Sequence, residues 1–372
     1  MVFKTENNKP FKLRILHISA RADIGGGPKH LHDLSKTMSK NYDSYQVIAA
    51  PNDTFFPAFK QIANKVVELP HRKLELKKLM ELRKLVKDKE INIIHSHGRG
   101  AGIYSRLLSY MTNARVVHTF HGIHQVKNFI GLAKDMFDKI FAHRVDHYIC
   151  VSTDEQKKAE EALYLAYDSK SSVILNGVDT EKFASISPKV NSSEKYLLGT
   201  LCRFNFQKGI DIAIECINKN QSFFRSQKII YIIQGDGEDF HVLKERVEEL
   251  KLEDIIKLPG PTREPIKFFE KIDAYISFSR WEGFPLSVIE AMAAKKPCIL
   301  SNVPGHQTFI ENELCLSFQL DNDNKLLSNI KNLIHSIETS HNLQNKAISF
   351  IQKELTLKKM SEKTCAIYKS LQ

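Results

Sequence analysis

Short apolar runs alternate with amphipathic segments along almost the whole chain. Runs of strand length recur in the first half at residues 13–19, 45–50, 65–69, 91–95, 115–120, 147–151 and 173–175. Segments with helical spacing of apolar residues separate them, at 29–39, 73–87, 100–110, 126–143 and 153–163. Strands that alternate with helices in this way are typical of a parallel sheet covered by helices.

The alternation starts again after the polar stretch 176–193, whose Gly177 and Pro188 are typical of a linker. Strands are predicted at 196–202, 228–234, 255–258, 274–278, 298–301 and 315–318. Helices are predicted at 210–218, 240–250, 265–271 and 286–294, and residues 322–372 have an almost entirely helical pattern. The sequence predicts an α/β protein with two Rossmann-like domains facing a cleft, 1–180 and 181–352. A C-terminal helix, 353–372, is predicted to return to the first domain.

Composition agrees with two soluble globular domains. The chain has 372 residues, of which 42% are apolar, and this exceeds the usual size of one core. The first ten residues lack the apolar segment of a signal peptide, and no run is long enough to cross a bilayer. The six cysteines are scattered without metal-site or disulfide spacing. We therefore expect a cytoplasmic protein.

The net charge of +11 lies mainly in the first half of the chain and predicts an anionic partner there. The segment 71–89 is rich in lysine and arginine and has one apolar side. Such a helix can lie on the inner face of an anionic membrane, but it is more often a surface helix packed on a sheet. Nucleic acid is not expected as a partner, because aromatic residues do not interleave with the cations.

Two carboxylates flank the start of one predicted helix. Glu282 follows the strand 274–278, and Glu290 lies about one turn into the helix 286–294. Ligands of open α/β sheets bind at the carboxyl ends of the strands, and a helix N-terminus favours an anion. These residues could serve a ligand with both hydroxyl and phosphate groups. The alternative is a solvated loop glutamate and a surface glutamate, although Glu290 stands among apolar residues.

Cations and glycines follow other strands at the same predicted edges. Arg203 and Lys208 come after the first strand of the second domain, where both could bind phosphate. Gly235 follows the next strand, and Gly25 and Gly26 precede the first helix of the chain, which is expected to have Pro28 as its first residue. Their backbones could approach an anionic group, or they could form simple tight turns.

Histidines gather after strands of the first domain. His95, His97, His118, His121 and His124 suggest zinc as a possible ligand, but no cysteine or carboxylate joins them at ligand spacing, so no metal is predicted. His121 ends a predicted strand and is interpreted as a polar site group, with a hydrogen-bonded core histidine as the alternative.

Taken together, these residues resemble the retaining glycosyltransferases of the GT-B fold, family 4, over nearly the whole chain. Glu282 and Glu290 match the E-x7-E motif of that family, and Arg203 with Lys208 matches its cation pair. His121 matches its central histidine. Gly25 and Gly26 match its first loop. Residues 146–152 match a later strand of the family, and residues 176–179 match its hinge.

The resemblance implies a role for each matched residue. Glu290 would hold ribose hydroxyls, Arg203 and Lys208 the diphosphate, and Glu282 with the backbone around Phe284, Pro285 and Leu286 the sugar. Pro259, in the strand end 258–261, would border the nucleobase, and His121 would act at the reacting sugar. One departure is Pro285, where the family more often has glycine. Residues 301–308 also match the family's Gly-Gly-x-x-Glu loop only loosely.

The implied activity is hexosyl transfer from a UDP- or GDP-sugar to a glycan or lipid-linked acceptor in cell-surface polysaccharide assembly, with retention of configuration. Neither a metal nor an organic cofactor is implied, since fixed cations and a helix N-terminus can stabilise the departing diphosphate. Two alternatives stay open. One is an epimerase or phosphorylase of the same fold, which would need a different product assay. The other is a non-catalytic sugar-nucleotide-binding subunit.

Overall fold

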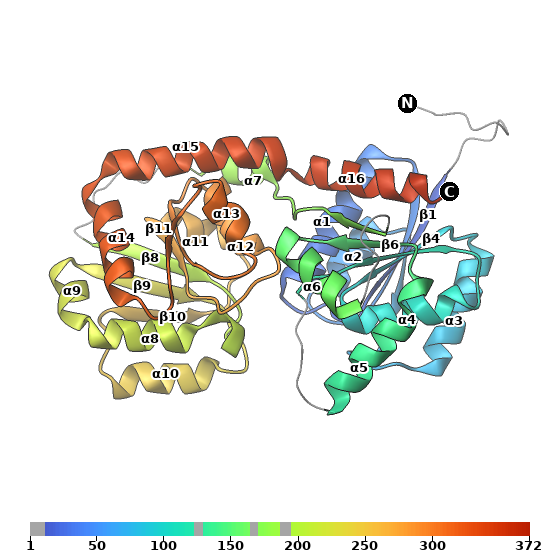
Figure 1. Cartoon of the computed structure of the whole chain (residues 1–372), viewed down its shortest axis with the longest axis horizontal. Helices are drawn as coiled ribbons and strands as arrows, with labels where there is room; N and C mark the ends of the chain where they lie inside the picture. The colour runs from blue at the N-terminus through green and yellow to red at the C-terminus, as the bar shows by residue number, and fades with distance from the viewer. Residues whose placement is uncertain (1–11, 123–128, 164–169, 187–194) are drawn as a thin grey trace. The chain divides into compact units, whose positions relative to one another are not determined.

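The computed structural model describes residues 12–122, 129–163, 170–186 and 195–372. The extreme N-terminus, His124 and Pro188 lie outside these ranges. The chain divides into two compact units (Figure 1), one formed by Met1–Asn176 with Leu357–Gln372 and the other by Gly177–Thr356. These limits lie within a few residues of 1–180, 181–352 and 353–372. Each unit contains one parallel sheet with alternating helices, so the predicted two-domain α/β class is confirmed.

The first unit is built on a seven-stranded parallel sheet in the order β3-β2-β1-β4-β5-β6-β7. Its strands are β1 (Leu13–Ser19), β2 (Ser44–Ala50), β3 (Lys65–Glu68), β4 (Ile93–His97), β5 (Arg115–Thr119), β6 (His147–Cys150) and β7 (Ser171–Val173). Strand β1 lies at the centre of the core, because Leu13 and Ile15 pack into the apolar cluster on one face of the sheet and Leu16 and Ile18 into the cluster on the other. Such double-sided burial is typical of parallel strands between two helical layers.

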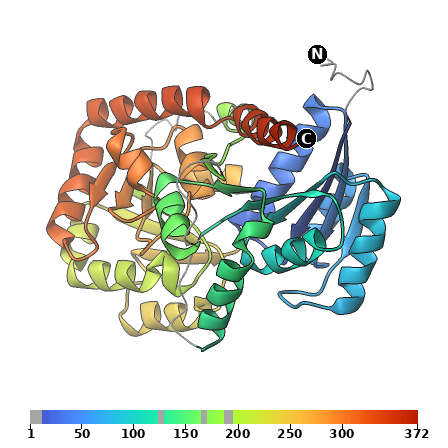
Figure 2. The same cartoon turned by 45° about the vertical axis from the view of Figure 1, so that its right-hand side comes forward.

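Helices cover both faces of this sheet. They are α1 (Gly26–Asn41), α2 (Phe56–Ile62), α3 (Leu76–Asp88), α4 (Arg99–Ser109), α5 (Phe129–Ile140), η1 (Ala142–Arg144), α6 (Thr153–Leu163) and α16 (Leu357–Ser370). In Figures 1 and 2, α16 (dark red) lies beside the blue helix α1, against which it packs. Met360 and Tyr368 of α16 join the core formed by Leu13, Ile15 and Leu34. The last helix of the chain therefore completes the first unit.

The strand predicted at 91–95 extends to His97 in the structure. The prediction ended too early because Ser96 and His97 are polar, yet both are buried in β4. Ser96 can lie in the core because its hydroxyl is 2.8 Å from Ser105 Oγ and 2.8 Å from His118 Nδ1. Buried polar groups are tolerated when neighbours satisfy their hydrogen bonds, and hydropathy alone does not show those neighbours.

The basic segment near residue 80 forms α3, which packs on the sheet through one side. Leu79, Leu82 and Val86 are buried in the core of the unit, whereas Leu76 is 73% and Met80 is 47% exposed. The apolar side predicted from sequence is thus used partly for packing, as a surface helix requires. No helix within the described ranges is both long and apolar enough to cross a membrane.

The second unit has a six-stranded parallel sheet in the order β10-β9-β8-β11-β12-β13. Its strands are β8 (Tyr196–Leu201), β9 (Ile229–Gln234), β10 (Ile256–Gly260), β11 (Ala274–Ser277), β12 (Cys298–Ser301) and β13 (Leu316–Phe318). Its helices are α7 (Thr180–Ala184), η2 (Phe206–Lys208), α8 (Ile210–Lys219), α9 (Gln221–Ser226), α10 (Phe240–Glu249), α11 (Pro265–Lys271), α12 (Leu286–Ala293), α13 (Gln307–Glu311), α14 (Asp323–His335) and α15 (Ile337–Glu354). Strands β9 and β10 follow β8 on one side of the sheet, and β11 to β13 follow on its other side. Ligands of such sheets bind where the strand order changes direction in this way, at the carboxyl ends of the strands next to β8.

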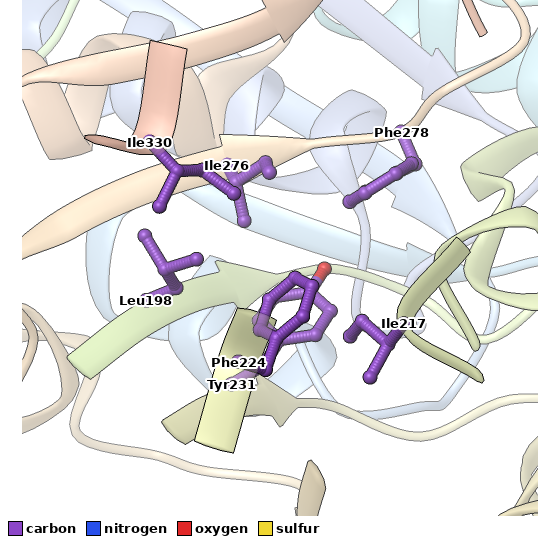
Figure 3. Close-up of a pocket in the computed structure, with 7 residues that line it drawn as sticks. All are labelled: Leu198, Ile217, Phe224, Tyr231, Ile276, Phe278 and Ile330. Atoms are coloured by element: carbon purple, nitrogen blue, oxygen red, sulfur yellow. The ribbon is translucent and has the colours of Figure 1, made fainter. Parts of the chain in front are cut away.

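Apolar side chains from three strands, three helices and the residue after β11 meet in the core of the second unit (Figure 3). The side chains drawn there are Leu198, Ile217, Phe224, Tyr231, Ile276, Phe278 and Ile330. They pack so closely that no water-sized space remains among them. The one polar side-chain atom of this group, the hydroxyl of Tyr231, lies 2.6 Å from Thr200 Oγ1. This dense core holds β8 and β11 side by side and so fixes the loops that follow them.

Candidate active site

The two loops that follow β8 and β11 bring a lysine and a glutamate together. Lys208 lies in η2 after β8, and Glu282 lies between β11 and α12. The ammonium Nζ of Lys208 is 2.5 Å from Glu282 Oε1, and the hydroxyl of Ser279 donates to the same oxygen at 2.6 Å. Gln207 donates to the other carboxylate oxygen at 3.3 Å. The strand order explains this meeting, because adjacent parallel strands end at the same edge of a sheet.

The Glu282 side chain is only 7% exposed, and that of Lys208 is 18% exposed. Burial by itself raises the pKa of the Glu282 carboxyl, but the charges of Lys208 and His306 and the hydrogen bonds from Lys208 and Ser279 outweigh it. The pKa is therefore lower than usual, and the carboxylate is ionised at neutral pH. A buried, ionised pair beside a helix start is suited to binding polar ligands.

The loop after β12, which matched the family motif only loosely, holds Glu282 in place. The backbone N–H of Glu282 donates to Pro304 O at 2.9 Å, and Ser301 Oγ donates to Ser279 O at 2.7 Å. His306 is fully buried, and its Nδ1 lies 2.8 Å from Ser301 O. Burial lowers the pKa of His306, although the charge of Glu282 raises it in part. Sequence reasoning missed this support, because only a Pro-Gly turn signal distinguishes the loop.

Gly305 lies against the backbone of Glu282, next to the hydrogen bond between Glu282 and Pro304. Its φ of +87° favours glycine, and a Cβ atom there would clash with the carbonyl oxygen of Glu282. The loop therefore approaches the backbone of the carboxylate more closely than a side chain permits. This close approach explains why position 305 is glycine, although the loop 301–308 matches the family motif only loosely.

The residues expected around the sugar lie at the start of α12. Phe284 is buried and stacks on Phe309 with ring centroids 4.9 Å apart. Pro285 immediately precedes the helix, with a φ of −74°, and Leu286 is the first helical residue. A proline at this position costs no helical hydrogen bond, because the first N–H groups of a helix have no partner within it. Glu290 lies in the second turn and is 4% exposed.

Arg203 and Gly235 follow the neighbouring strands β8 and β9. Arg203 is half-buried two residues after β8, and Gly235 directly follows β9. Gly235 has a φ of +151°, and its N–H donates to Gly260 O at 2.9 Å. Pro259 is an exposed residue of β10. Lys208, Glu282, Arg203 and Gly235 thus all belong to loops at the carboxyl edge of one sheet.

Replacing Gly235 by alanine should destabilise the second unit more than the same change at Gly260. A Cβ at Gly235 would clash with the carbonyl oxygen of Cys202, whereas a Cβ at Gly260, whose φ is +87°, meets nothing within 4 Å. Gly260→Ala therefore carries only the backbone strain, about 1–3 kcal/mol. The clash at Gly235 should add roughly 1–3 kcal/mol. Urea unfolding of both variants gives the difference, and equal losses would contradict the close approach of Gly235 to Cys202.

In the first unit, the glycine-rich turn leads into α1. The helix begins at Gly26 after Gly25, so Pro28 is its third residue and not its first as predicted. Proline is tolerated there because it still lies among the first-turn N–H groups that make no helical bond. A Cβ on Gly27 would lie 3.6 Å from the His121 ring, which places the turn beside that histidine.

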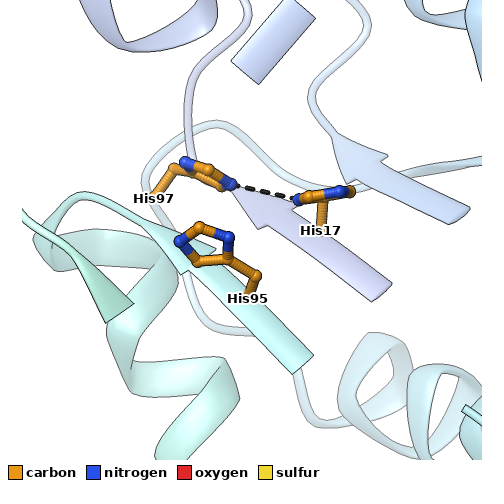
Figure 4. A group of neighbouring side chains, drawn as sticks. All are labelled: His17, His95 and His97. Carbon is orange, nitrogen blue, oxygen red and sulfur yellow. Dashed lines mark hydrogen bonds between the residues drawn. The ribbon is translucent and has the colours of Figure 1, made fainter. Parts of the chain in front are cut away.

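Among the residues that the structure describes, five histidines meet at the carboxyl edge of the first sheet. His17 lies beside His95 and His97 because β1 and β4 pair in register (Figure 4). His30 of α1 and His121 of the loop after β5 contact the ring of His97. His17 Nδ1 lies 3.2 Å from His97 Nε2, and His97 Nδ1 lies 3.5 Å from His121 Nε2. The spacing of these residues along the chain did not predict this group.

Burial keeps the histidine group neutral. It lowers the pKa of His17 to about 3 and that of His30 to about 4. The side chain of Gln46 raises the pKa of His17 in part, and the hydrogen bond that His30 Nδ1 donates to Asn176 Oδ1 raises that of His30 in part. The pKa values of His95, His97 and His121 also lie well below the usual value, first because of burial and then because of the neighbouring histidines. His121 is half-buried and neutral, and can offer an imidazole nitrogen but no positive charge.

Known families and sequences resemble this chain along most of its length. The model described as Glycosyltransferase Family 4 matches residues 24–182, and the model described as Glycosyl transferases group 1 matches residues 182–350. A UDP-Gal:alpha-D-GlcNAc-diphosphoundecaprenol alpha-1,3-galactosyltransferase of Escherichia coli is 28% identical over 255 residues, which are 64% of this chain and 65% of that protein. An O-antigen biosynthesis glycosyltransferase of Escherichia coli is 26% identical over 312 residues, covering 80% and 84% of the two chains.

Solved structures agree in fold. A glycosyltransferase from Rickettsia africae superposes with a TM-score of 0.81 at 20% identity, over 97% of this chain and 98% of that one. An Anabaena protein in complex with UDP-glucose also gives 0.81, at 17% identity over 96% and 100% of the chains. Together with the two parallel sheets, these matches define a GT-B fold. The chain belongs to the group 1 glycosyltransferases.

Proposed function

We propose that the protein transfers a hexose from a UDP-sugar to a glycan or lipid-linked glycan, with retention of configuration, in the assembly of a cell-surface polysaccharide. The observation that carries this proposal is the buried ion pair of Lys208 and Glu282 beside the start of α12. Relatives that assemble O-antigen, and a fold neighbour that binds UDP-glucose, support the choice of donor and acceptor class.

In this proposal the residues of the second unit divide the donor among them. Glu290 receives hydrogen bonds from the ribose, and Arg203 with Lys208 holds the diphosphate. Glu282, which Ser279 orients, faces a sugar hydroxyl. Negative charge develops on the terminal phosphate as the glycosidic bond breaks, and Lys208 and the first N–H groups of α12 stabilise it. The same phosphate oxygen then accepts the proton of the attacking hydroxyl, so retention needs no covalent intermediate. No metal or organic cofactor enters this reaction, because the cations of the chain supply the positive charge that the departing diphosphate requires.

His121 is assigned to the sugar step because of its match to the family motif and its neutral imidazole. A His121→Asn variant should lower kcat with little change in the dissociation constant of UDP, since the histidine contacts the reacting sugar and not the nucleotide. Steady-state kinetics and a UDP titration measure the two quantities. An unchanged kcat, or a loss of UDP affinity as large as the loss of kcat, would contradict this role.

The donor is tested by melting the protein with a panel of UDP-, GDP- and ADP-sugars, because a ligand that binds the folded state raises the melting temperature. We expect a shift with UDP-sugars. Glu290→Gln should weaken UDP binding by roughly tenfold or more, since hydrogen bonds to a charged group are worth about 1.5–3 kcal/mol. Glu249→Gln, on the exposed side of α10, is the matched control.

Release of UDP that depends on an added glycan acceptor then separates transfer from epimerisation, which needs no acceptor. The proposal fails if no nucleotide sugar binds, or if Glu290→Gln binds UDP as tightly as the unchanged protein. Binding without acceptor-dependent release would instead indicate a binding subunit.

A further inference from the structure

The histidine group of the first unit has the geometry of a metal site. Two sets of three histidines bring one nitrogen each within 4.8 Å of one another. The first set is His17, His95 and His97 (Figure 4), and the second is His30, His97 and His121. In a tetrahedral zinc site the ligand nitrogens are about 3.3 Å apart, since each lies about 2.0–2.1 Å from the ion.

The first set is the poorer candidate, because His95 has both nitrogens engaged. Its Nδ1 is 2.5 Å from the Tyr368 hydroxyl and its Nε2 is 2.6 Å from Thr119 Oγ1. A metal there would have to break one of two short hydrogen bonds that join β4 to α16 and β5. Figure 4 shows the remaining pair, in which His97 points toward His17.

The second set has the arrangement that ligands of a transition metal require. His30 Nδ1 lies 2.8 Å from Asn176 Oδ1, an acceptor, so the proton of the neutral imidazole is on Nδ1. The lone pair of Nε2 is then the one that can bind a metal. His97 Nε2 lies 3.2 Å from His17, so its Nδ1 is available, and that atom is 3.5 Å from His121 Nε2. Metal-bound histidines usually donate the N–H of their other ring nitrogen to an acceptor, and Asn176 Oδ1 and His17 Nδ1 occupy that position here.

We propose that His30, His97 and His121 form a binding site for a divalent transition metal, with zinc as the best match, in which Asn176 and His17 orient two of the ligands. The three imidazoles come from α1, β4 and the loop after β5. Neutral imidazole is the form that binds metal, and burial supplies it at pH 7 without the loss of protons that acidic ligands would require. Three histidines leave a fourth position open to water or to an incoming hydroxyl.

Binding at this site occupies the nitrogen of His121. This consequence rests on the proposed function, in which the same imidazole acts in the sugar step. Zinc should therefore inhibit transfer reversibly, and a chelator should restore it. Inhibition is a secondary readout, because binding of the metal can be measured with no substrate present.

Cobalt titration of the untagged, chelator-treated full chain tests the site directly. We expect equimolar binding with the intense visible absorption of tetrahedral cobalt, and displacement of that absorption by zinc. Asn176→Ala should weaken binding roughly 10–100-fold, as outer-sphere partners of metal ligands do. Removal of one ligand in His30→Asn or His121→Asn should abolish the tetrahedral spectrum.

His32→Asn is the matched control, since His32 belongs to the same helix but contacts Asp33 and not the group. Circular dichroism establishes that each variant is folded. If His30→Asn does not fold, His121→Asn, at a half-buried loop position, decides the question. Octahedral cobalt only, or an unchanged spectrum in His121→Asn, overturns the proposal. Zinc binding without inhibition would support the metal site and count against the role of His121 in transfer.

Discussion

Replacing Lys208 by methionine is expected to lower kcat/KM of sugar transfer about 100- to 1000-fold, the effect of removing one fixed group that stabilises developing charge. The change should also destabilise the second unit. Glu282 is 7% exposed and loses its ion pair with Lys208, while the hydrogen bonds from Ser279 and Gln207 remain. Removal of one partner from a buried pair typically costs about 3–5 kcal/mol, because the other charge stays buried.

A second substitution separates the two effects. In Lys208→Met with Glu282→Gln the buried charge is gone, so urea unfolding should return toward the stability of the unchanged protein while transfer stays low. Lys346→Met is the matched control, since its pair with Glu313 is 2.6 Å long but exposed. Exposed pairs contribute at most about 1 kcal/mol. If Lys208→Met is no less stable than Lys346→Met, Glu282 does not carry a buried charge.

Acid is expected to unfold the first unit before the second. The folded unit keeps His17 and His30 neutral, with pKa values of about 3 and about 4, whereas in the unfolded chain they titrate near 6.5. As the pH falls below about 6.5, the unfolded state therefore binds protons that the folded state does not bind, and the free energy of unfolding decreases. The stability is fully present above that pH and is lost progressively toward the folded pKa values.

The effect should be large because several histidines add to it. Each unit of pKa difference is about 1.4 kcal/mol, so His17 and His30 alone account for several kcal/mol. A whole domain is stable by only about 5–15 kcal/mol. His95, His97 and His121 have pKa values shifted in the same direction by burial and by one another. The charges of Asp33 and Lys29 shift the pKa of His30 in opposite directions.

The single tryptophan makes this prediction measurable unit by unit. Trp281 belongs to the second unit, so its fluorescence reports that unit, whereas far-ultraviolet circular dichroism reports both. Between about pH 6 and 4, the range in which the histidine stabilisation is lost, we expect the dichroism signal to fall before the fluorescence of Trp281 changes. His97→Asn should reduce the slope of unfolding free energy against pH, and His335→Asn on the exposed side of α14 should not. Coincident transitions would contradict the prediction.

Much of the candidate donor site could be predicted because its residues are close in sequence. Glu282, Phe284 and Glu290 belong to one strand-turn-helix segment, so a local motif defines their order. Ser279 and the loop residues Gly305 and His306, which hold that segment in place, have no comparable motif. Their contribution depends on contacts between the loops after β11 and β12, and such contacts arise only when the sheet is assembled.

The histidine group shows the same limit more strongly. Histidines near predicted strand ends were evident in the sequence, but ligand spacing along the chain argued against zinc. In the folded unit, His17 pairs in register with His95, and Ser19 with His97, so distant strands bring the rings together. Residues 80 positions apart became neighbours because β1 lies next to β4 and not because of any local pattern.

The sequence by itself determined the α/β class, the restart of the alternation and the edge at which the polar residues lie. Local periodicity suffices for these, because apolar spacing reports the type of element and its buried faces. Strand order, register and the pairing of Lys208 with Glu282 were decided only by the tertiary structure. They depend on packing between segments far apart in the chain, which no local spacing encodes. The same packing brought four buried histidines and the half-buried His121 into one neutral group.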